Sequence, residues 1–135
     1  MSSSLETSGE AALVPMRKCI LVVEDELLIR MMLSDELRDV GYQVIEASDA
    51  DEALVILGAV GPDLIISDVR MPGSLDGLEL LALVRNTHPT LPVIITSGHL
   101  PPKQALIEGA TRFVAKPYSL EQVVQMAQDV IERPL

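Results

Sequence analysis

The sequence has few aromatic residues and almost no cysteine. Aromatic residues make up 2% of the 135 residues, and tryptophan is absent. A core must therefore be built from aliphatic side chains and methionine, as is usual for parallel sheets covered by helices. The single cysteine, Cys19, excludes a disulfide within the chain and fits a reducing compartment. Because Cys19 opens an apolar run, we interpret it as a small buried hydrophobe.

Positive charge and long apolar runs are also scarce. Ten Lys and Arg residues stand against 20 Asp and Glu residues, which gives a net charge of −10. Such an acidic surface repels phosphate backbones, so we expect no direct nucleic-acid partner. Acidic or turn residues interrupt every apolar run, so we expect no membrane partner or membrane span. The N-terminus also lacks a signal-peptide pattern, and the sequence therefore predicts a cytoplasmic protein.

What remains is an apolar-rich chain with the length of one domain. It is 48% hydrophobic and 22% charged, a composition that excludes a disordered polymer. The first residues, MSSSLETSGE, are mostly polar. We therefore predict a flexible tail over residues 1–16 and one folded domain over residues 17–135.

Strand and helix patterns alternate along the folded part of the chain. Short aliphatic runs predict strands, and longer runs with apolar residues at helical spacing predict helices. The predicted strands are 19–23, 42–47 (near a sheet edge), 64–67, 91–96 and 111–115. The predicted helices are 26–40, 50–57, 75 or 76 to about 86, 101–109 and 120 to about 132. This alternation predicts an α/β fold: a doubly wound parallel sheet with helices on both faces.

Polar and charged side chains stand at the carboxyl ends of four predicted strands, where open parallel sheets bind their ligands. These residues, in chain order, are Glu24 and Asp25, Asp68, Thr96, and Lys116. Taken alone, each is more often a turn former, a helix cap or a solvated side chain. Their joint placement at four strand ends of one sheet is a much stronger signal.

The combination of residue types points to phosphoryl chemistry. Gathered carboxylates repel one another and raise one another's pKa. Mg²⁺ relieves that repulsion, and it is typically held by one or two carboxylates together with water and phosphate oxygens. An adjacent lysine and hydroxyl complete a site for a phosphoryl group. A carboxylate can itself accept that group and form an aspartyl phosphate.

Four segments carry a family resemblance. They are LVVEDE (21–26), LIISDVRMPG (64–73), IITS (94–97) and FVAKPY (113–118). In this order and spacing they resemble the receiver domain of two-component response regulators, in particular stand-alone receivers like the chemotaxis regulators. The resemblance covers about residues 17–133. It implies a flavodoxin-like (βα)5 fold whose five-stranded parallel sheet has the strand order 2-1-3-4-5.

The resemblance implies a phosphoacceptor and a metal site. Asp68 would accept the phosphoryl group. Mg²⁺ would be bound directly by Asp25 and Asp68, and mainly through water by Glu24. The backbone carbonyl oxygen of Arg70 would be a further ligand.

Three other residues match family positions that contact the phosphoryl group or respond to it. Thr96 would hydrogen-bond its oxygens and Lys116 would pair with them. Phe113 matches the aromatic switch residue that turns inward when the threonine moves toward the phosphate. A plain core ring is nearly as good an interpretation of Phe113.

The sequence departs from the family pattern beside the phosphoacceptor. Gly73, Ser74 and Leu75 precede Asp76 and Gly77, where the family usually has two residues. This one-residue insertion should change the loop next to Asp68 without removing the nucleophile.

The resemblance also implies partners. A histidine kinase or histidine phosphotransfer protein would donate the phosphoryl group, and a downstream protein target would recognise the product. The chain would then be a signalling switch in a two-component phosphorelay, not an enzyme. The helix predicted over residues 26–40 is rich in Leu and Met, and an exposed part of it could serve a helix-bundle partner or a homodimer.

Three alternatives remain open at this point. A hydrolase of the haloacid dehalogenase kind would need a second acid two residues after Asp68, where the chain has Arg70. A receiver-like module could bind partners without phosphorylation. The chain could also be a receiver domain excised from a larger response regulator or hybrid kinase.

Overall fold

The computed structural model describes residues 17–132 of the chain. In chain order the elements in this range are β1 (Cys19–Val23), α2 (Leu27–Asp39), β2 (Gln43–Ala47), α3 (Ala50–Ala59), β3 (Leu64–Asp68), α4 (Gly77–Thr87), β4 (Val93–Ser97), α5 (Pro102–Ile107), β5 (Arg112–Ala115) and α6 (Leu120–Glu132). The tail predicted over residues 1–16 lies outside the described residues.

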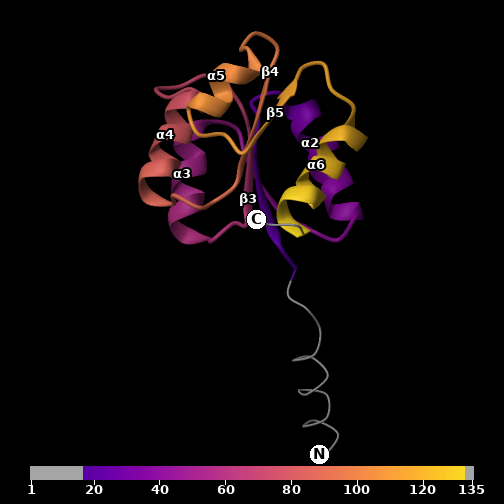
Figure 1. Cartoon of the computed structure of the whole chain (residues 1–135). Coiled ribbons are helices and arrows are strands. Elements are labelled where there is room, and N and C mark those ends of the chain that lie inside the picture. The colour runs from indigo at the N-terminus through magenta and orange to yellow at the C-terminus, as the bar shows by residue number, and fades with distance from the viewer. Residues whose placement is uncertain (1–16, 133–135) are drawn as a thin grey trace, which may run out of the picture.

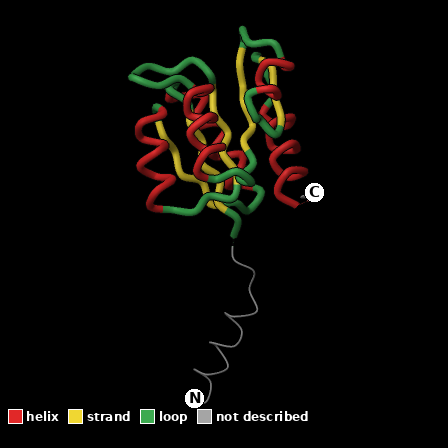
Figure 2. The backbone as a smooth tube through the Cα atoms, turned by 60° about the vertical axis from the view of Figure 1, so that its left-hand side comes forward, coloured by secondary structure: helices red, strands yellow, loops and turns green. Residues whose placement is uncertain are grey.

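The five strands form one parallel sheet in the order β2-β1-β3-β4-β5. Helices α3, α4 and α5 cover one face of this sheet, and α2 and α6 cover the other (Figure 1). Figure 2 shows the same layers with the strands in yellow between red helices. The predicted α/β class and strand order are confirmed, and β2 lies at an edge as expected.

Two apolar clusters fill the space between the sheet and its helices. Every residue of β1, β3 and β4 is buried, so these strands contribute side chains to both faces. Leu21 and Ile65 pack under α3, α4 and α5, whereas Ile20 and Ile66 pack under α2 and α6. This two-residue alternation is the strand period, and each fully buried aliphatic side chain contributes about 1.5–3 kcal/mol. The scarcity of aromatic residues is met by an aliphatic core.

The observed element ends lie within two residues of the predicted ones, and the bounds of β1 and α6 match the prediction. Two of the differences have identifiable causes. Helix α4 begins at Gly77 because Asp76 caps it, accepting the Glu79 N–H at 2.8 Å while the Glu79 carboxylate accepts the Asp76 N–H. Strand β4 begins at Val93, after Pro92, which has no N–H to donate. None of the helices within residues 17–132 is long and apolar enough to cross a bilayer.

The strand ends converge at one edge of the sheet. Asp68 at the end of β3 is in register with Thr96 on β4, which places the two side by side. The backbone of Gly77 lies against this strand end, and its N–H donates to the Val69 carbonyl at 2.7 Å. A Cβ at position 77 would overlap the carbonyl oxygen of Asp68. Only glycine therefore fits here.

Candidate functional site: carboxylates and a lysine at the sheet edge

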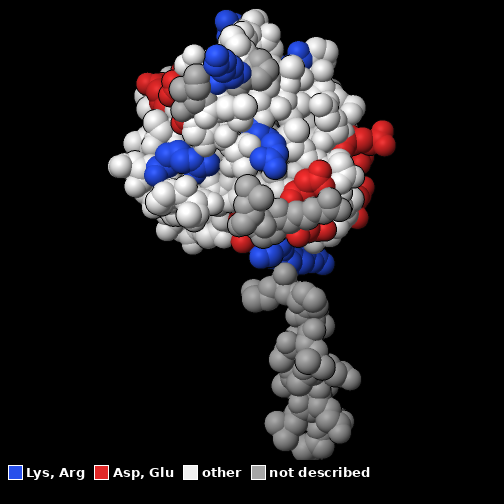
Figure 3. All heavy atoms as spheres, viewed as in Figure 1, with Lys and Arg blue, Asp and Glu red and all other residues white. Residues whose placement is uncertain are grey.

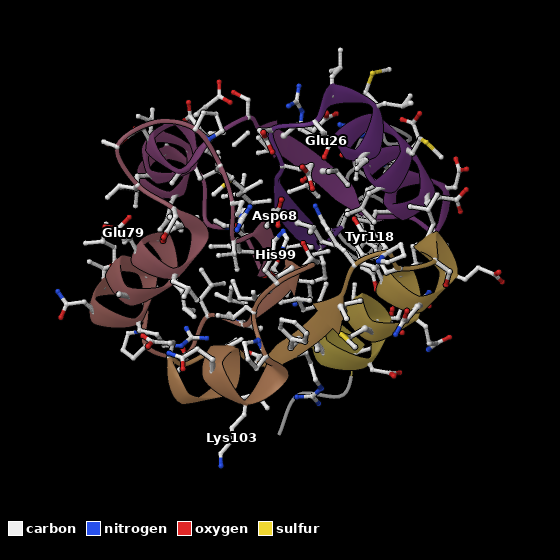
Figure 4. All side chains as sticks on the ribbon, turned by 90° about the horizontal axis from the view of Figure 1, so that it is seen from above. Glu26, Asp68, Glu79, His99, Lys103 and Tyr118 are labelled. Carbon is white, nitrogen blue, oxygen red and sulfur yellow. The ribbon has the colours of Figure 1, made fainter. Side chains whose placement is uncertain are left out.

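Three carboxylates meet beyond the carboxyl ends of β1 and β3. Glu24, Asp25 and Asp68 each offer an oxygen, and these atoms all lie within 4.8 Å of one another. Glu24 and Asp68 are 3% and 8% exposed, whereas Asp25 is exposed. Seen along the strands from above, Asp68 lies near the centre of the molecule, with His99 beside it (Figure 4). The predicted gathering of the three acids is present in the structure, and the donor set suits a hard divalent cation.

The ammonium group of Lys116 bridges two of these acids. It follows β5 and donates to Glu24 Oε1 at 3.0 Å and to Asp68 Oδ2 at 2.9 Å. Burial alone lowers the pKa of Lys116, but the hydrogen bonds and charges of Asp68 and Glu24 outweigh it, so the pKa lies above its ordinary value. Lys116 is therefore held in its charged form.

The remaining negative charge is only partly compensated. Burial raises the pKa of the Glu24 carboxyl above its ordinary value, and the charge of Asp68 adds to the increase. The Glu26 N–H, which Glu24 Oε2 accepts at 3.1 Å, and the Lys116 ammonium act in the opposite direction. The Lys116 ammonium contacts two of the three clustered carboxyl groups, Glu24 and Asp68, so the cluster still favours a further cation.

Both oxygens of Asp68 are held in place. Oδ1 accepts the Val69 N–H at 2.8 Å, and Oδ2 accepts from Lys116. The hydroxyl of Ser67 donates to the Asp68 carbonyl oxygen at 2.9 Å. The carboxylate is therefore oriented before any ligand arrives.

A polar hollow of about 250 Å³ opens over this carboxylate. Its lining includes Asp25, Asp68, Arg70, His99 and Lys116. Arg70 is thus placed beside the acids, as predicted, and its proposed role as a carbonyl ligand stays a prediction.

Thr96 and Phe113 lie on neighbouring strands behind the hollow. Thr96 is 2% exposed and faces Asp68 across the β3–β4 pair. Phe113 is in register with Ile95, the residue before Thr96, and its ring is partly buried against the cluster under α3, α4 and α5. The structure thus places Thr96 beside Asp68 and Phe113 on the next strand, and the proposed roles of both stay predictions.

Two polar contacts at the site were not predicted. The Ser97 hydroxyl accepts the N–H groups of His99 and Leu100 at 3.1 and 3.0 Å, which shapes the loop after β4. The guanidinium of Arg30 donates to the Glu24 carbonyl oxygen at 2.8 Å. Arg30 is the one basic residue between Lys18 and Arg38, and that isolation was the available signal.

The inserted residue beside the site is accommodated by a turn. Gly73 has a φ of +101°, a value that favours glycine. Next to it, the Ser74 hydroxyl lies 3.0 and 3.1 Å from the two carboxylate oxygens of Asp51 on α3. The loop that holds the inserted residue therefore contacts α3, and Asp68 lies at the end of β3.

The sequence matches the family model of the response regulator receiver domain over residues 20–128. The chain belongs to this family. The family match agrees with the geometry, because its motifs are the segments that meet at the hollow. Asp-phosphorylated signalling in two-component systems is characteristic of the family.

Several characterised proteins are similar to this receiver. The nitrogen assimilation regulatory protein NtrX of Azorhizobium caulinodans is 38% identical over 117 residues, which cover 84% of this chain and 26% of NtrX. The virulence transcriptional regulatory protein PhoP of Salmonella typhimurium is 37% identical, over 84% of this chain and 52% of PhoP. This receiver therefore spans about a quarter to a half of the length of these relatives.

Solved receiver domains have the same fold. The receiver domain of NtrX from Brucella abortus has a TM-score of 0.79 at 37% identity, covering 84% of this chain and 98% of that one. The chemotaxis protein CheY4 of Vibrio cholerae has a TM-score of 0.79 at 34% identity, covering 85% and 99%.

Proposed function

We propose that this receiver is a phosphorylation-dependent switch that accepts a phosphoryl group on Asp68 from a histidine kinase or histidine phosphotransfer protein. The observation that carries the proposal is the placement of the Asp68 carboxylate: it lies 2.9 Å from the Lys116 ammonium, beside Glu24 and Asp25, and it lines an open hollow. A protein-binding switch is preferred to a hydrolase, because Arg70 stands where a haloacid dehalogenase would place its second acid.

The acid cluster supports Mg²⁺ as the bound metal. Asp25 and Asp68 would hold it directly, Glu24 mainly through water, and the Arg70 carbonyl as a further ligand. When bound, Mg²⁺ would neutralise part of the charge on the phosphoryl group during transfer.

The residues of the chain divide the transfer between them. An Asp68 oxygen attacks phosphorus, the P–N bond to the donor histidine breaks, and the electron pair of that bond stays with the imidazole, which takes up a proton. Lys116, already in contact with Asp68, pairs with the phosphoryl oxygens. The Thr96 hydroxyl, on the adjacent strand, donates to them as well.

The output would follow from the movement of Thr96. Drawing this side chain toward the phosphoryl group opens space next to Phe113, whose strand pairs with that of Thr96. The ring would turn inward, and the surface of α5, β5 and α6 would change for a downstream protein.

An exposed apolar surface on α2 supports docking of a helical donor next to Asp68. Leu27, Leu28, Met31 and Met32 are 45–69% exposed. An open groove of about 410 Å³ continues this surface over Met32, Pro117, Tyr118 and Leu120. Lys116 lines both this groove and the polar hollow, so a helix lying in the groove would bring a histidine close to Asp68.

The phosphoacceptor is tested with a small-molecule phosphodonor, Mg²⁺ and intact-mass measurement. We expect the mass to rise by one phosphoryl group in the wild-type protein and in Asp39→Asn, an exposed acid at the end of α2. Asp68→Asn should stay unlabelled. An unchanged wild-type mass, or labelling of Asp68→Asn, would contradict the proposal.

The exposed apolar surface of α2 is tested separately, by comparing phosphoryl transfer from a histidine kinase with transfer from the small-molecule phosphodonor. Leu28→Glu and Met31→Glu should slow transfer from histidine kinases of the host while labelling by the small donor stays unchanged. Val55→Glu is the matched control, because Val55 is 73% exposed on α3, on the other side of the sheet. Equal transfer rates in all variants would reject this surface. Loss of a dimer in Leu28→Glu, measured by size-exclusion chromatography with light scattering, would assign it to a homodimer instead.

A further inference from the structure

Arg30 connects the acid pair of the site to strand β2. It lies in the first turn of α2, where its N–H donates to the Glu26 carbonyl. Its guanidinium donates to the Glu24 carbonyl oxygen at 2.8 Å and to Glu46 Oε1 at 3.2 Å. The side chains of Arg30 and Glu46 are 15% and 25% exposed, so this connection is largely shielded from water.

The peptide that Arg30 contacts joins Glu24 to Asp25. The N–H of Glu24 donates to the Ala47 carbonyl at 3.0 Å, and the carbonyl of Glu24 accepts from Arg30. Glu24 is therefore fixed through its backbone on both sides. This arrangement sets the direction in which the two neighbouring carboxylates leave the chain.

Glu46 binds the guanidinium of Arg30 and also binds a second arginine, which serves as a comparison. Its other oxygen accepts from Arg38 at 3.2 Å. Arg38 lies on the same helix, but its side chain is 43% exposed and its other partners are Val44 O and Asp35. Arg30 and Arg38 thus share one partner, and of the two, Arg30 is the one that contacts the acid loop.

We infer that Arg30 is a positioning residue for the proposed metal site: it presets the Glu24–Asp25 peptide so that both carboxylates face Asp68. The inference rests on the proposed Mg²⁺ binding. Groups that orient metal ligands typically change metal affinity by about 10–100-fold when they are removed.

The sign of the effect separates positioning from simple electrostatics. A positive charge near a metal site repels Mg²⁺, so removing a guanidinium that acts only through its charge would tighten Mg²⁺ binding. Removing a guanidinium that orients the ligands would weaken it. These two roles therefore predict opposite results for one variant.

The experiment measures Mg²⁺ affinity by calorimetric titration of wild-type protein, Arg30→Gln, Arg30→Lys and the control Arg38→Gln. We expect Arg30→Gln to weaken binding by about tenfold. Arg30→Lys should recover part of that loss, because lysine can donate to the Glu24 carbonyl but lacks the planar fork. Arg38→Gln should change affinity by less than about twofold, as exposed ion pairs contribute little.

A second measurement reports on the loop without metal. In ¹H–¹⁵N spectra of the metal-free protein, the amide signals of Glu24, Asp25 and Glu26 should shift in Arg30→Gln and stay in place in Arg38→Gln. Urea unfolding of each variant shows whether it is folded under the conditions of the titration.

Unchanged or tighter Mg²⁺ binding in a folded Arg30→Gln would overturn the inference while leaving the metal site intact. Absence of Mg²⁺ binding in the wild-type protein would instead show that the proposed metal site is wrong, and the inference would fall with it. Equal weakening in Arg30→Gln and Arg38→Gln would assign the effect to the shared Glu46 and would also overturn it.

Discussion

Lys116 and Asp68 are 48 residues apart in sequence, yet the lysine Nζ lies 2.9 Å from Asp68 Oδ2. The same nitrogen contacts Glu24, so a single ammonium holds together the ends of β1, β3 and β5. The Lys116 side chain is 21% exposed, whereas those of Glu24 and Asp68 are 4% and 9% exposed. The ammonium group is thus partly solvated, whereas the two carboxylates are almost fully buried. Removing the lysine would leave these carboxylates buried without a positive partner, which costs free energy.

Lys116→Met should destabilise the protein in the absence of Mg²⁺. We expect a loss of about 1–3 kcal/mol in the free energy of unfolding, below the full cost of breaking a buried pair because Lys116 is partly exposed. Saturating MgCl₂ should restore more stability to this variant than to wild type, because Mg²⁺ can replace the missing positive charge. Urea unfolding with and without MgCl₂ measures both effects. Equal stabilisation of the two proteins by Mg²⁺ would contradict this prediction.

The two acids after β1 should contribute unequally to Mg²⁺ affinity. Asp25 is exposed and free to present its oxygen, whereas Glu24 is buried and engaged by Lys116 and the Glu26 N–H. We therefore expect Asp25→Ala to weaken Mg²⁺ binding sharply and Glu24→Ala to weaken it less. Calorimetric titration is the measurement, and equal affinities of the two variants would refute the assigned roles.

Gly77→Ala should disturb the end of β3. The added methyl group would overlap the Asp68 carbonyl, and backbone atoms cannot move aside as a flexible side chain can. We expect a loss of about 2–3 kcal/mol in the free energy of unfolding. Gly58→Ala is the control, because a Cβ on this α3 residue meets nothing within 4 Å. We expect this substitution to raise the free energy of unfolding by at most about 1 kcal/mol. Similar changes in the free energy of unfolding at the two positions would show that the close backbone contact at Gly77 does not exclude a Cβ.

Tyr42 should make stability depend on alkaline pH. Burial, and then the hydrogen bond at 2.6 Å to Glu132 and its charge, raise the pKa of the Tyr42 hydroxyl above its ordinary value. Above about pH 10 the tyrosine of the unfolded state releases a proton that the folded state keeps. The contribution of Tyr42 to the free energy of unfolding is therefore complete below about pH 10 and is lost as the pH rises toward the pKa of the folded state.

The test compares wild-type protein with Tyr42→Phe by urea unfolding at a series of pH values. Near neutral pH we expect Tyr42→Phe to cost about 1 kcal/mol, the typical contribution of such a hydrogen bond. The difference between the two proteins should shrink as the pH rises above about 10. A difference that stays constant over this range would contradict the prediction.

Local patterns were sufficient for most of the fold. Alternating aliphatic strands and amphipathic helices predicted the α/β class, because strand and helix periods are properties of short segments. Element ends were less predictable, since they depend on individual caps such as the Asp76–Glu79 pair. The acids at the strand ends could also be inferred, because parallel strands must bring their carboxyl ends to one edge.

The sequence alone thus determined which residue types reach the site: Glu24, Asp25, Asp68, Thr96 and Lys116 stand at the carboxyl ends of the predicted strands. The tertiary structure alone decided how they are held. Arg30 donates to the carbonyl of the peptide between Glu24 and Asp25. The Ser97 hydroxyl accepts a backbone N–H of the loop after β4, and the Ser74 hydroxyl contacts Asp51. Such contacts depend on side-chain direction and on distances between segments far apart in the chain, and no periodic pattern encodes them.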